Sequence, residues 1–287
     1  MIPWLIPVYL FVFGLCIGSF LNVVILRYRP ERSAFALMPL TGRSHCMACG
    51  KTLAWYELLP VISFLIQRGR CRSCRINLSA QYPLVELLTG FIFLTPLYFY
   101  DPFMRLYSLE IGWLWVLAFL AFLVIAAIDY YWMIIPDELN LFLVALGFGR
   151  IALEQMNGTF GAFTGSFAGS FAALFGFRND VAVNHIAGAA IGVLLIGVII
   201  LVTRGRGMGV GDLKLAGALG FLFGWPDIGL LLMFAFVLGS LYGVYVLLAH
   251  TKRMKDAVPF GPFIILGALT LMFYGKQLLD LYFRIFS

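Results

Sequence analysis

Two carboxylates in this apolar sequence stand where ionisable groups are costly. Asp129 closes the run LWVLAFLAFLVIAAID, and Asp212 follows alternating glycines in GMGVGDLKLAGALG (207–220). An ionisable group at membrane depth costs a few kcal/mol and is a functional candidate by default. Two carboxylates that converge can share a proton, so that one activates a water and the other donates to a carbonyl oxygen. The pair therefore predicts peptide hydrolysis by an aspartate dyad.

The glycines before Asp212 leave no side chains between the backbone and a ligand. An extended substrate segment could approach there and pair with the backbone. A flexible turn is the ordinary interpretation, and a phosphate-binding loop is disfavoured because no strand precedes it. Glu86 could be a substrate contact or a plain carboxylate near a helix N-terminus. The predicted substrate contacts are Gly209, Gly211, Pro136, Asp137, Lys214 and Glu86.

Four cysteines form two Cys-x-x-Cys pairs with 21 residues between them. Each pair can turn two thiolates toward one tetrahedral ion, so the two pairs together predict a structural zinc site. Two disulfides are a rival interpretation that an oxidising compartment would favour, and a redox pair is a third. The predicted metal ligands are Cys46, Cys49, Cys71 and Cys74.

The composition favours a polytopic membrane protein. Hydrophobic residues make up 62% of the 287 residues and charged residues 12%, whereas soluble proteins carry about 25% charged residues. We expect an all-α fold with about eight transmembrane helices of roughly 20 residues and a small cytoplasmic zinc-binding loop domain. The expected helices cover about 4–26, 84–100, 111–128, 139–155, 186–203, 213–224, 228–249 and 260–280.

The basic residues predict an orientation. The first apolar run lacks a basic segment before it and a cleavage site, so we expect a retained helix with its N-terminus outside. The segments 27–83, 129–138, 204–212 and 250–259 then share one side, and with Lys214 they hold 15 of the 20 Lys and Arg residues. The positive-inside rule makes that side cytoplasmic. The net charge of +6 therefore requires no nucleic acid.

The segment TFGAFTGSFAGSFAALFGF (159–177) carries phenylalanines at helical spacing beside glycines. It suits a ninth span, an interfacial helix or a small-residue packing seam. A ninth span would put Asp129 and Asp212 on opposite sides, so we expect an interfacial or re-entrant helix within an outer-face insertion near 156–184. The expected domains are a first transmembrane helix (1–26), a cytoplasmic zinc-binding domain (27–83) and a seven-helix membrane peptidase core (84–287).

Most other acids are expected at outer loops or helix ends, where water solvates them. This group consists of Asp101, Glu110, Asp180, Asp227 and Asp280.

The motifs together resemble the bacterial type 4 prepilin peptidases, which are membrane aspartic proteases with a Gly-x-Gly-Asp motif. The resemblance covers nearly the whole chain in the expected order, although 156–184 is longer than expected. It rests on GSFLNVVILRYRP (18–30), CMACGKTLAWYELLPVISFLIQRGRCRSC (46–74), SAQYPLVELLTG (79–90), D-x6-PD (129–137), GMGVGDLKLAGALG (207–220) and PFGPFI (259–264).

The resemblance implies that Asp129 and Asp212 are catalytic and that the four cysteines bind zinc. It implies a protein of the bacterial inner (cytoplasmic) membrane that cuts prepilins or pseudopilins on the cytoplasmic face, after a leader-terminal glycine. The new N-terminal residue would then be methylated from S-adenosylmethionine, in the service of type IV pili or type II secretion. The candidates for binding this methyl donor are the zinc loop and Glu86.

Two other functions stay open. An intramembrane aspartic protease without methyltransferase activity would share the dyad, but it gives the basic zinc loop no purpose. A proton-coupled transporter would use the two acids at a site near the membrane midplane. Against a transporter, both acids are predicted at helix ends on one face, and no inverted repeat is visible.

Overall fold

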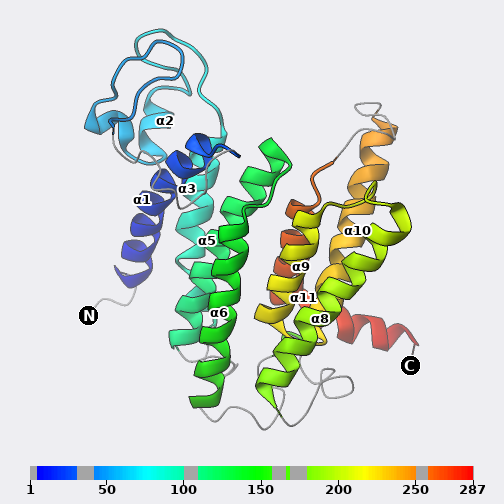
Figure 1. Ribbon diagram of the computed structural model, residues 1–287. Helices are drawn as coiled ribbons and strands as arrows, with labels where there is room; N and C mark the ends of the chain where they lie inside the picture. Colours follow the sequence, from blue (N-terminus) through cyan, green and yellow to red (C-terminus); the bar gives the residue numbers. More distant parts are fainter. Residues whose placement is uncertain are drawn as a thin grey trace. The chain divides into compact units, whose positions relative to one another are not determined.

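The computed structural model describes residues 5–30, 42–99, 109–156, 166–168, 180–249 and 258–286. In these ranges the regular structure is helical apart from two isolated β-bridges, so the predicted all-α fold is confirmed there. The chain divides into two compact units, Met1–Val124 and Ile125–Ser287 (Figure 1). The predicted domain boundaries at 26/27 and 83/84 stay predictions.

The first unit contains α1, a 3₁₀ helix η1, α2, α3, α4 and most of α5, which continues into the second unit. Their bounds are Leu5–Arg27, Trp55–Leu58, Ile62–Ile66, Gln81–Ile92, Thr95–Phe99 and Leu109–Trp132. The second unit adds α6, α8, α9, α10 and α11. These span Asp137–Met156, Val181–Thr203, Val210–Phe223, Asp227–Leu248 and Gly261–Phe286.

Six helices of the described ranges are long and apolar enough to cross a membrane, namely α1, α5, α6, α8, α10 and α11. The other two expected spans are shorter. Helix α9 has 14 residues, which is about 21 Å at 1.5 Å per residue, against a hydrocarbon core of about 30 Å. The predicted count of about eight spans therefore stays a prediction.

The helix predicted over 84–100 is two helices, because α3 ends at Ile92 and α4 begins at Thr95. Pro96 explains the break, since proline has no N–H to donate and is tolerated in the first turn of a new helix.

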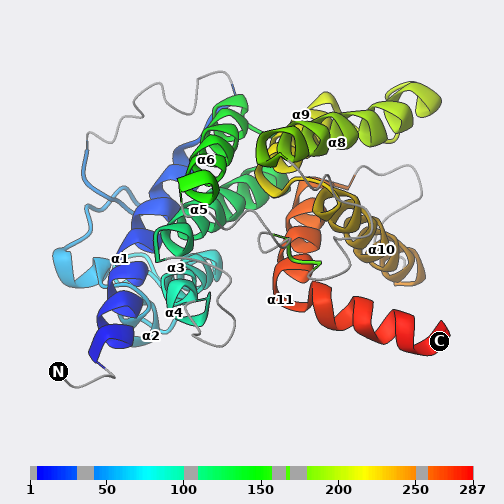
Figure 2. The same ribbon diagram turned by 90° about the horizontal axis from the view of Figure 1, so that it is seen from below.

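Helices α1 and α3 of the first unit lie side by side (Figure 2). Gly14 and Gly18 are four residues apart on α1 and face α3. A Cβ at Gly14 would lie 2.7 Å from the carbonyl oxygen of Thr89, and one at Gly18 would lie 2.7 Å from the Cα of Glu86. This small-xxx-small spacing lets two backbones approach closely, and it fixes Glu86 against the middle of α1.

Helix α9 is the buried centre of the second unit. It packs on α8 (Figure 1), where a Cβ at Gly220 would collide with the carbonyl of Gly188, and one at Gly192 with the carbonyl of Ala216. All residues from Ala218 to Phe223 are buried. This close packing fixes α9, which carries Asp212 in its first turn, along the length of α8.

The helix predicted within 159–177 lies outside the described residues, apart from Ser166–Ala168. Its relation to the membrane stays a prediction.

Candidate active site and metal centre

Asp129 lies one turn before the end of α5, and its residue is 4% exposed. Its Oδ2 accepts the backbone N–H of Gly261, the first residue of α11, at 2.9 Å. A Cβ at Gly261 would lie 2.6 Å from the same oxygen. The start of α11 therefore closes against the carboxylate, and this close approach requires glycine.

Asp212 is the third residue of α9. Its Oδ2 accepts the N–H of Gly209, the residue before the helix, at 3.0 Å. An acid at this position satisfies a free donor of the first turn and suits the positive end of the helix dipole. The two carboxylates are close enough for the charge of Asp212 to act on Asp129. The structure thus brings together two acids that lie 83 positions apart in the sequence.

An exposed ion pair joins the two aspartate motifs. Lys214 Nζ donates to both carboxylate oxygens of Asp137, at 2.8 and 2.7 Å. A Cβ at Gly211 would lie 3.5 Å from the Cβ of Ile135, so the turn after Asp129 runs beside the start of α9. Pro136 is buried in that turn. The predicted contacts Gly211, Pro136, Asp137 and Lys214 therefore lie where the turn after α5 meets the start of α9, and their role toward a substrate stays a prediction.

The four cysteines of the first unit form one cluster. Their Sγ atoms all lie within 4.8 Å of one another, and Cys46 Sγ lies 3.8 Å from Cys74 Sγ. Four sulfurs at about 2.3 Å from a tetrahedral zinc ion would be about 3.8 Å apart, whereas a disulfide requires about 2.05 Å. The cysteines are therefore positioned to hold a metal ion.

We call the two Cys-x-x-Cys segments, 44–53 and 69–78, the cysteine knuckles. They share one backbone pattern. The N–H of Cys46 donates to the carbonyl of Lys51, and the N–H of Cys71 donates to the carbonyl of Ile76. The fourth residue after each of these cysteines has a left-handed backbone, with φ of +70° at Gly50 and +61° at Arg75. Two matching turns thus present two thiols each to one point.

The backbone around the cluster favours thiolates. The N–H groups of Cys49 and Ala48 lower the pKa of the Cys46 thiol to about 6. The N–H of Ile76 acts the same way on Cys74, but burial and the neighbouring sulfurs outweigh it and raise the pKa of Cys74 to about 11. Four thiolates this close repel one another, and a divalent cation would remove that repulsion. The donor set therefore fits zinc.

Glu86 belongs to the first unit, whereas the two aspartates belong to the second. It is 6% exposed, and its Oε2 accepts the N–H of Val61 at 2.7 Å. Glu57 of η1 is also buried, and it accepts the N–H of Ala54 and pairs with Lys51 at 3.2 Å. These bonds lower the pKa of Glu57, the Ala54 N–H most and Lys51 next.

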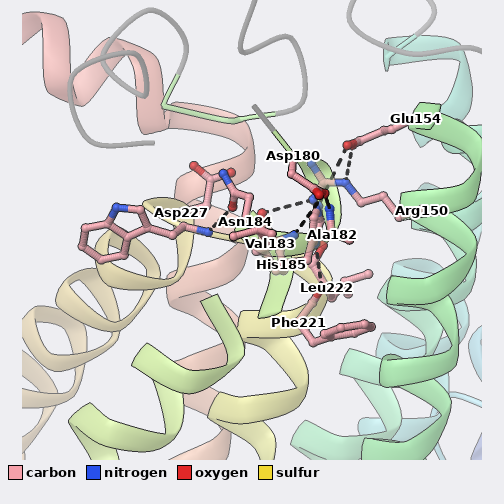
Figure 3. Close-up of polar contacts among 12 residues, drawn as sticks. Arg150, Glu154, Asp180, Ala182, Val183, Asn184, His185, Phe221, Leu222 and Asp227 are labelled. Carbon is pink, nitrogen blue, oxygen red and sulfur yellow. Dashed lines mark hydrogen bonds and ion pairs between the residues drawn. The ribbon is translucent and has the colours of Figure 1, made fainter. Parts of the chain in front are cut away.

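A buried polar cluster lies at the C-terminal end of α9 (Figure 3). Arg150 Nε donates to Glu154 Oε1 at 2.7 Å, and Arg150 Nη1 donates to the carbonyl of Leu222 at 2.8 Å. His185 Nδ1 lies 2.7 Å from the carbonyl oxygen of Phe221. Side chains of α6 and α8 thus satisfy carbonyls of the last turn of α9, which lack intrahelical partners.

The sequence predictions missed this cluster. Arg150 and Glu154 are four residues apart inside a predicted span, and that intramembrane pair was a signal that could have found them. The prediction that Asp227 is solvated is wrong, because it is 1% exposed and accepts Ser166 Oγ at 2.6 Å and the N–H of Phe167 at 3.0 Å. Ser166 and Phe167 therefore donate to the carboxylate at the start of α10 in place of the expected water. Of the remaining acids, Asp101 lies outside the described residues.

Comparison with known proteins decides the family. Residues 115–244 match the Type IV leader peptidase family, and residues 12–100 match the Bacterial Peptidase A24 N-terminal domain. A relative from Pseudomonas putida is 30% identical over 93% of this chain and 90% of its own length. The chain belongs to the type IV leader peptidase family.

Other relatives agree. One from Burkholderia pseudomallei (strain 1026b) is 30% identical over 92% of this chain and 84% of its own length. One from Bacillus subtilis (strain 168) is 29% identical over 96% of this chain and 97% of its own length. All three are named prepilin leader peptidase/N-methyltransferase. No solved structure matches the chain. The leader peptidase match contains Asp129 and Asp212, and the N-terminal domain match contains the four cysteines.

Proposed function

We propose that this chain is a prepilin leader peptidase and N-methyltransferase that cuts with Asp129 and Asp212. One observation carries the peptidase proposal. Two carboxylates from different helices interact electrostatically, and each is held by one backbone N–H, from Gly261 and Gly209. Both lie in the range that matches the leader peptidase family. A transporter or a peptidase without methyl transfer is not favoured, because the relatives are named for both activities.

The dyad would hydrolyse the leader peptide bond with one shared proton. Asp212 takes a proton from a water as the water oxygen bonds to the carbonyl carbon, and Asp129 gives its proton to the carbonyl oxygen. The carbon–nitrogen bond then breaks, and the leaving amine takes a proton from Asp212 while the carbonyl oxygen returns one to Asp129. The position of Asp212 at a helix N-terminus supports its role as the base, since the dipole favours the anion there.

The substrates would be prepilins or pseudopilins, cut after a leader-terminal glycine. Gly209 and Gly211 leave the backbone beside Asp212 free of side chains, as an extended substrate requires. Asp137 and Lys214, which are exposed, would line the same approach, with Pro136 buried in the turn directly before Asp137. The clustering of basic residues on one side supports an active site that faces the cytoplasm of the bacterial inner membrane.

Zinc would hold the cysteine knuckles in shape. The sulfur spacing and four thiol donors favour a closed structural site rather than a catalytic one, which would keep a position open. S-adenosylmethionine would supply a methyl group on a positively charged sulfur to the amine that cleavage exposes. Glu86 accepts a hydrogen bond from Val61, in the segment that joins the cysteine knuckles, and this position supports its predicted role in methyl-donor binding more than its predicted role as a substrate contact in leader cleavage.

The test uses the purified full-length chain and a purified prepilin, with mass spectrometry of the product. We expect loss of the leader after a glycine and, when S-adenosylmethionine is present, a further gain of one CH₂ group at the new N-terminus. An uncut prepilin would contradict the peptidase assignment. Cleavage without the mass gain would leave the peptidase and contradict the methyltransferase.

A further inference from the structure

A cavity of about 340 Å³ lies in the first unit among α1, α3 and the cysteine knuckles. Its apolar surface comes from Val23, Leu26, Leu58, Phe64, Ile76 and Leu78. This volume is in the range of sites for small organic molecules, which are mostly apolar with a few placed polar groups. The peptide hydrolysis described above does not use this space, and the metal site meets it only at Cys46 and Cys71.

One polar atom on the cavity wall, the amide oxygen of Asn22, has no hydrogen-bond partner among the described residues. Asn22 of α1 is 2% exposed, and its Nδ2 donates to the carbonyl of Tyr82 at 3.0 Å. Its amide oxygen, by contrast, is buried without a hydrogen bond. A buried polar atom without a partner is costly, and a bound donor group would remove that cost after a small turn of the side chain.

Two buried carboxylates also line the cavity. Glu57 is paired with Lys51. Glu86 accepts the N–H of Val61 and, among the residues that the structure describes, forms no ion pair. A carboxylate in such a wall favours a cationic ligand and disfavours a purely anionic one such as phosphate.

We propose that this cavity binds the methyl donor, a sulfonium nucleoside of the S-adenosylmethionine class, with Glu86 and Asn22 as its main polar contacts. The inference rests on the proposed methyltransferase function. An adenine and a ribose suit the apolar walls and the free amide oxygen, and the sulfonium suits Glu86. Arg27, which also lines the cavity, would suit the carboxylate of the methionine part.

This assignment links the metal to methylation. Cys46 and Cys71, one ligand from each knuckle, lie on the cavity wall. A metal that fixes the knuckles therefore fixes part of the donor site, while the two aspartates belong to the other unit.

Donor binding is the direct test, measured without turnover. The zinc-loaded full chain in detergent is dialysed to equilibrium against tritiated S-adenosylmethionine, and separately against S-adenosylhomocysteine, which lacks the sulfonium charge. The variants are Glu86→Gln and Asn22→Leu. Glu110→Gln makes the same charge change on an exposed carboxylate of the same unit, and Asp212→Asn removes the proposed base of cleavage. Zinc content and thermal unfolding report whether each variant folds.

We expect Glu86→Gln to weaken S-adenosylmethionine binding roughly 30-fold or more, the scale for removing one partner of a buried charged pair. The loss should be smaller for S-adenosylhomocysteine, a difference that general loosening of the fold would not produce. Asn22→Leu should weaken both ligands, whereas Glu110→Gln and Asp212→Asn should bind like wild type. Equal binding by Glu86→Gln and wild type would overturn the cavity assignment and leave the proposed function intact.

Ultraviolet crosslinking of the bound tritiated donor gives a second measurement on wild type, which does not depend on any variant folding. A labelled peptide within 19–27, 44–58 or 63–86 would support the cavity. A label within 125–286 would overturn it. Failure of the wild type to bind the donor, with prepilin cleavage preserved, would contradict the methyltransferase half of the proposed function together with this site.

Discussion

Gly261→Ala is expected to slow prepilin cleavage without unfolding the protein. An added Cβ would lie 2.6 Å from Asp129 Oδ2, closer than real side chains approach, and 3.1 Å from its Cγ. Either the carboxylate or the start of α11 must therefore move, and the 2.9 Å hydrogen bond from the Gly261 N–H to Asp129 is lost or distorted.

The magnitude follows from that hydrogen bond. A hydrogen bond to a charged group contributes about 1.5–3 kcal/mol, which corresponds to a fall of roughly 10- to 100-fold in kcat if it holds the dyad in its reactive geometry. Misplacement of a catalytic group by about 1 Å produces losses of the same size. KM should change little, because the substrate contacts near Asp212 are untouched.

The assay measures initial rates of leader removal by the purified chain, with Gly243→Ala as the matched control. Gly243 lies in α10 of the same unit, and a Cβ there meets nothing within 4 Å. That control should cleave like wild type and gain a little helix stability. Equal kcat for Gly261→Ala and Gly243→Ala would refute the role given to the Asp129–Gly261 contact.

Three further predictions concern parts of the molecule outside the dyad. Arg150→Met removes the partner of buried Glu154 and of the Leu222 carbonyl, so thermal unfolding in detergent should show a loss of about 3–5 kcal/mol; an unchanged melting temperature would count against the polar cluster as an anchor of α9. Because the pKa of Glu57 is lowered in the folded chain, its stabilisation is present above the ordinary Glu pKa and is lost as the pH falls through the lowered value. The difference in melting temperature between wild type and Glu57→Gln should therefore shrink in acid, and a constant difference would contradict this. Removal of the metal with a chelator should abolish donor binding, measured by dialysis, more completely than prepilin cleavage, and zinc should restore it; a chelated protein that binds the donor normally would contradict the link between knuckles and cavity.

Local patterns predicted the helices well because each apolar run is bounded by charged, glycine or proline residues. The expected helix over 4–26 is found at Leu5–Arg27, and that over 228–249 at Asp227–Leu248. The paired Cys-x-x-Cys spacing predicted the cysteine cluster, since each knuckle is formed by residues near one another in the sequence. The broken helix at Pro96 was missed because its apolar run is continuous.

Contacts between distant segments could not be predicted in this way. The sequence suggested the PFGPFI motif as part of a resemblance, but it gave Gly261 no role, because its partner Asp129 is 132 residues away. Asp227 was expected in water for the same reason, as Ser166 reaches it from 61 residues away. Glu86 was predicted both as a substrate contact and as a candidate for methyl-donor binding, and no pattern in the sequence indicated its bond to Val61, in the segment that joins the cysteine knuckles.

The most direct measurement is the rate of prepilin cleavage by Asp129→Asn and Asp212→Asn, each compared with Asp280→Asn, a similar change at a partly exposed position of α11. Each dyad variant should fold, bind the methyl donor and lose cleavage by roughly 100-fold or more, the scale for removal of a general acid or base. Asp280→Asn should cleave like wild type. Cleavage by either dyad variant at the rate of Asp280→Asn would contradict the assignment of the aspartates as the catalytic pair.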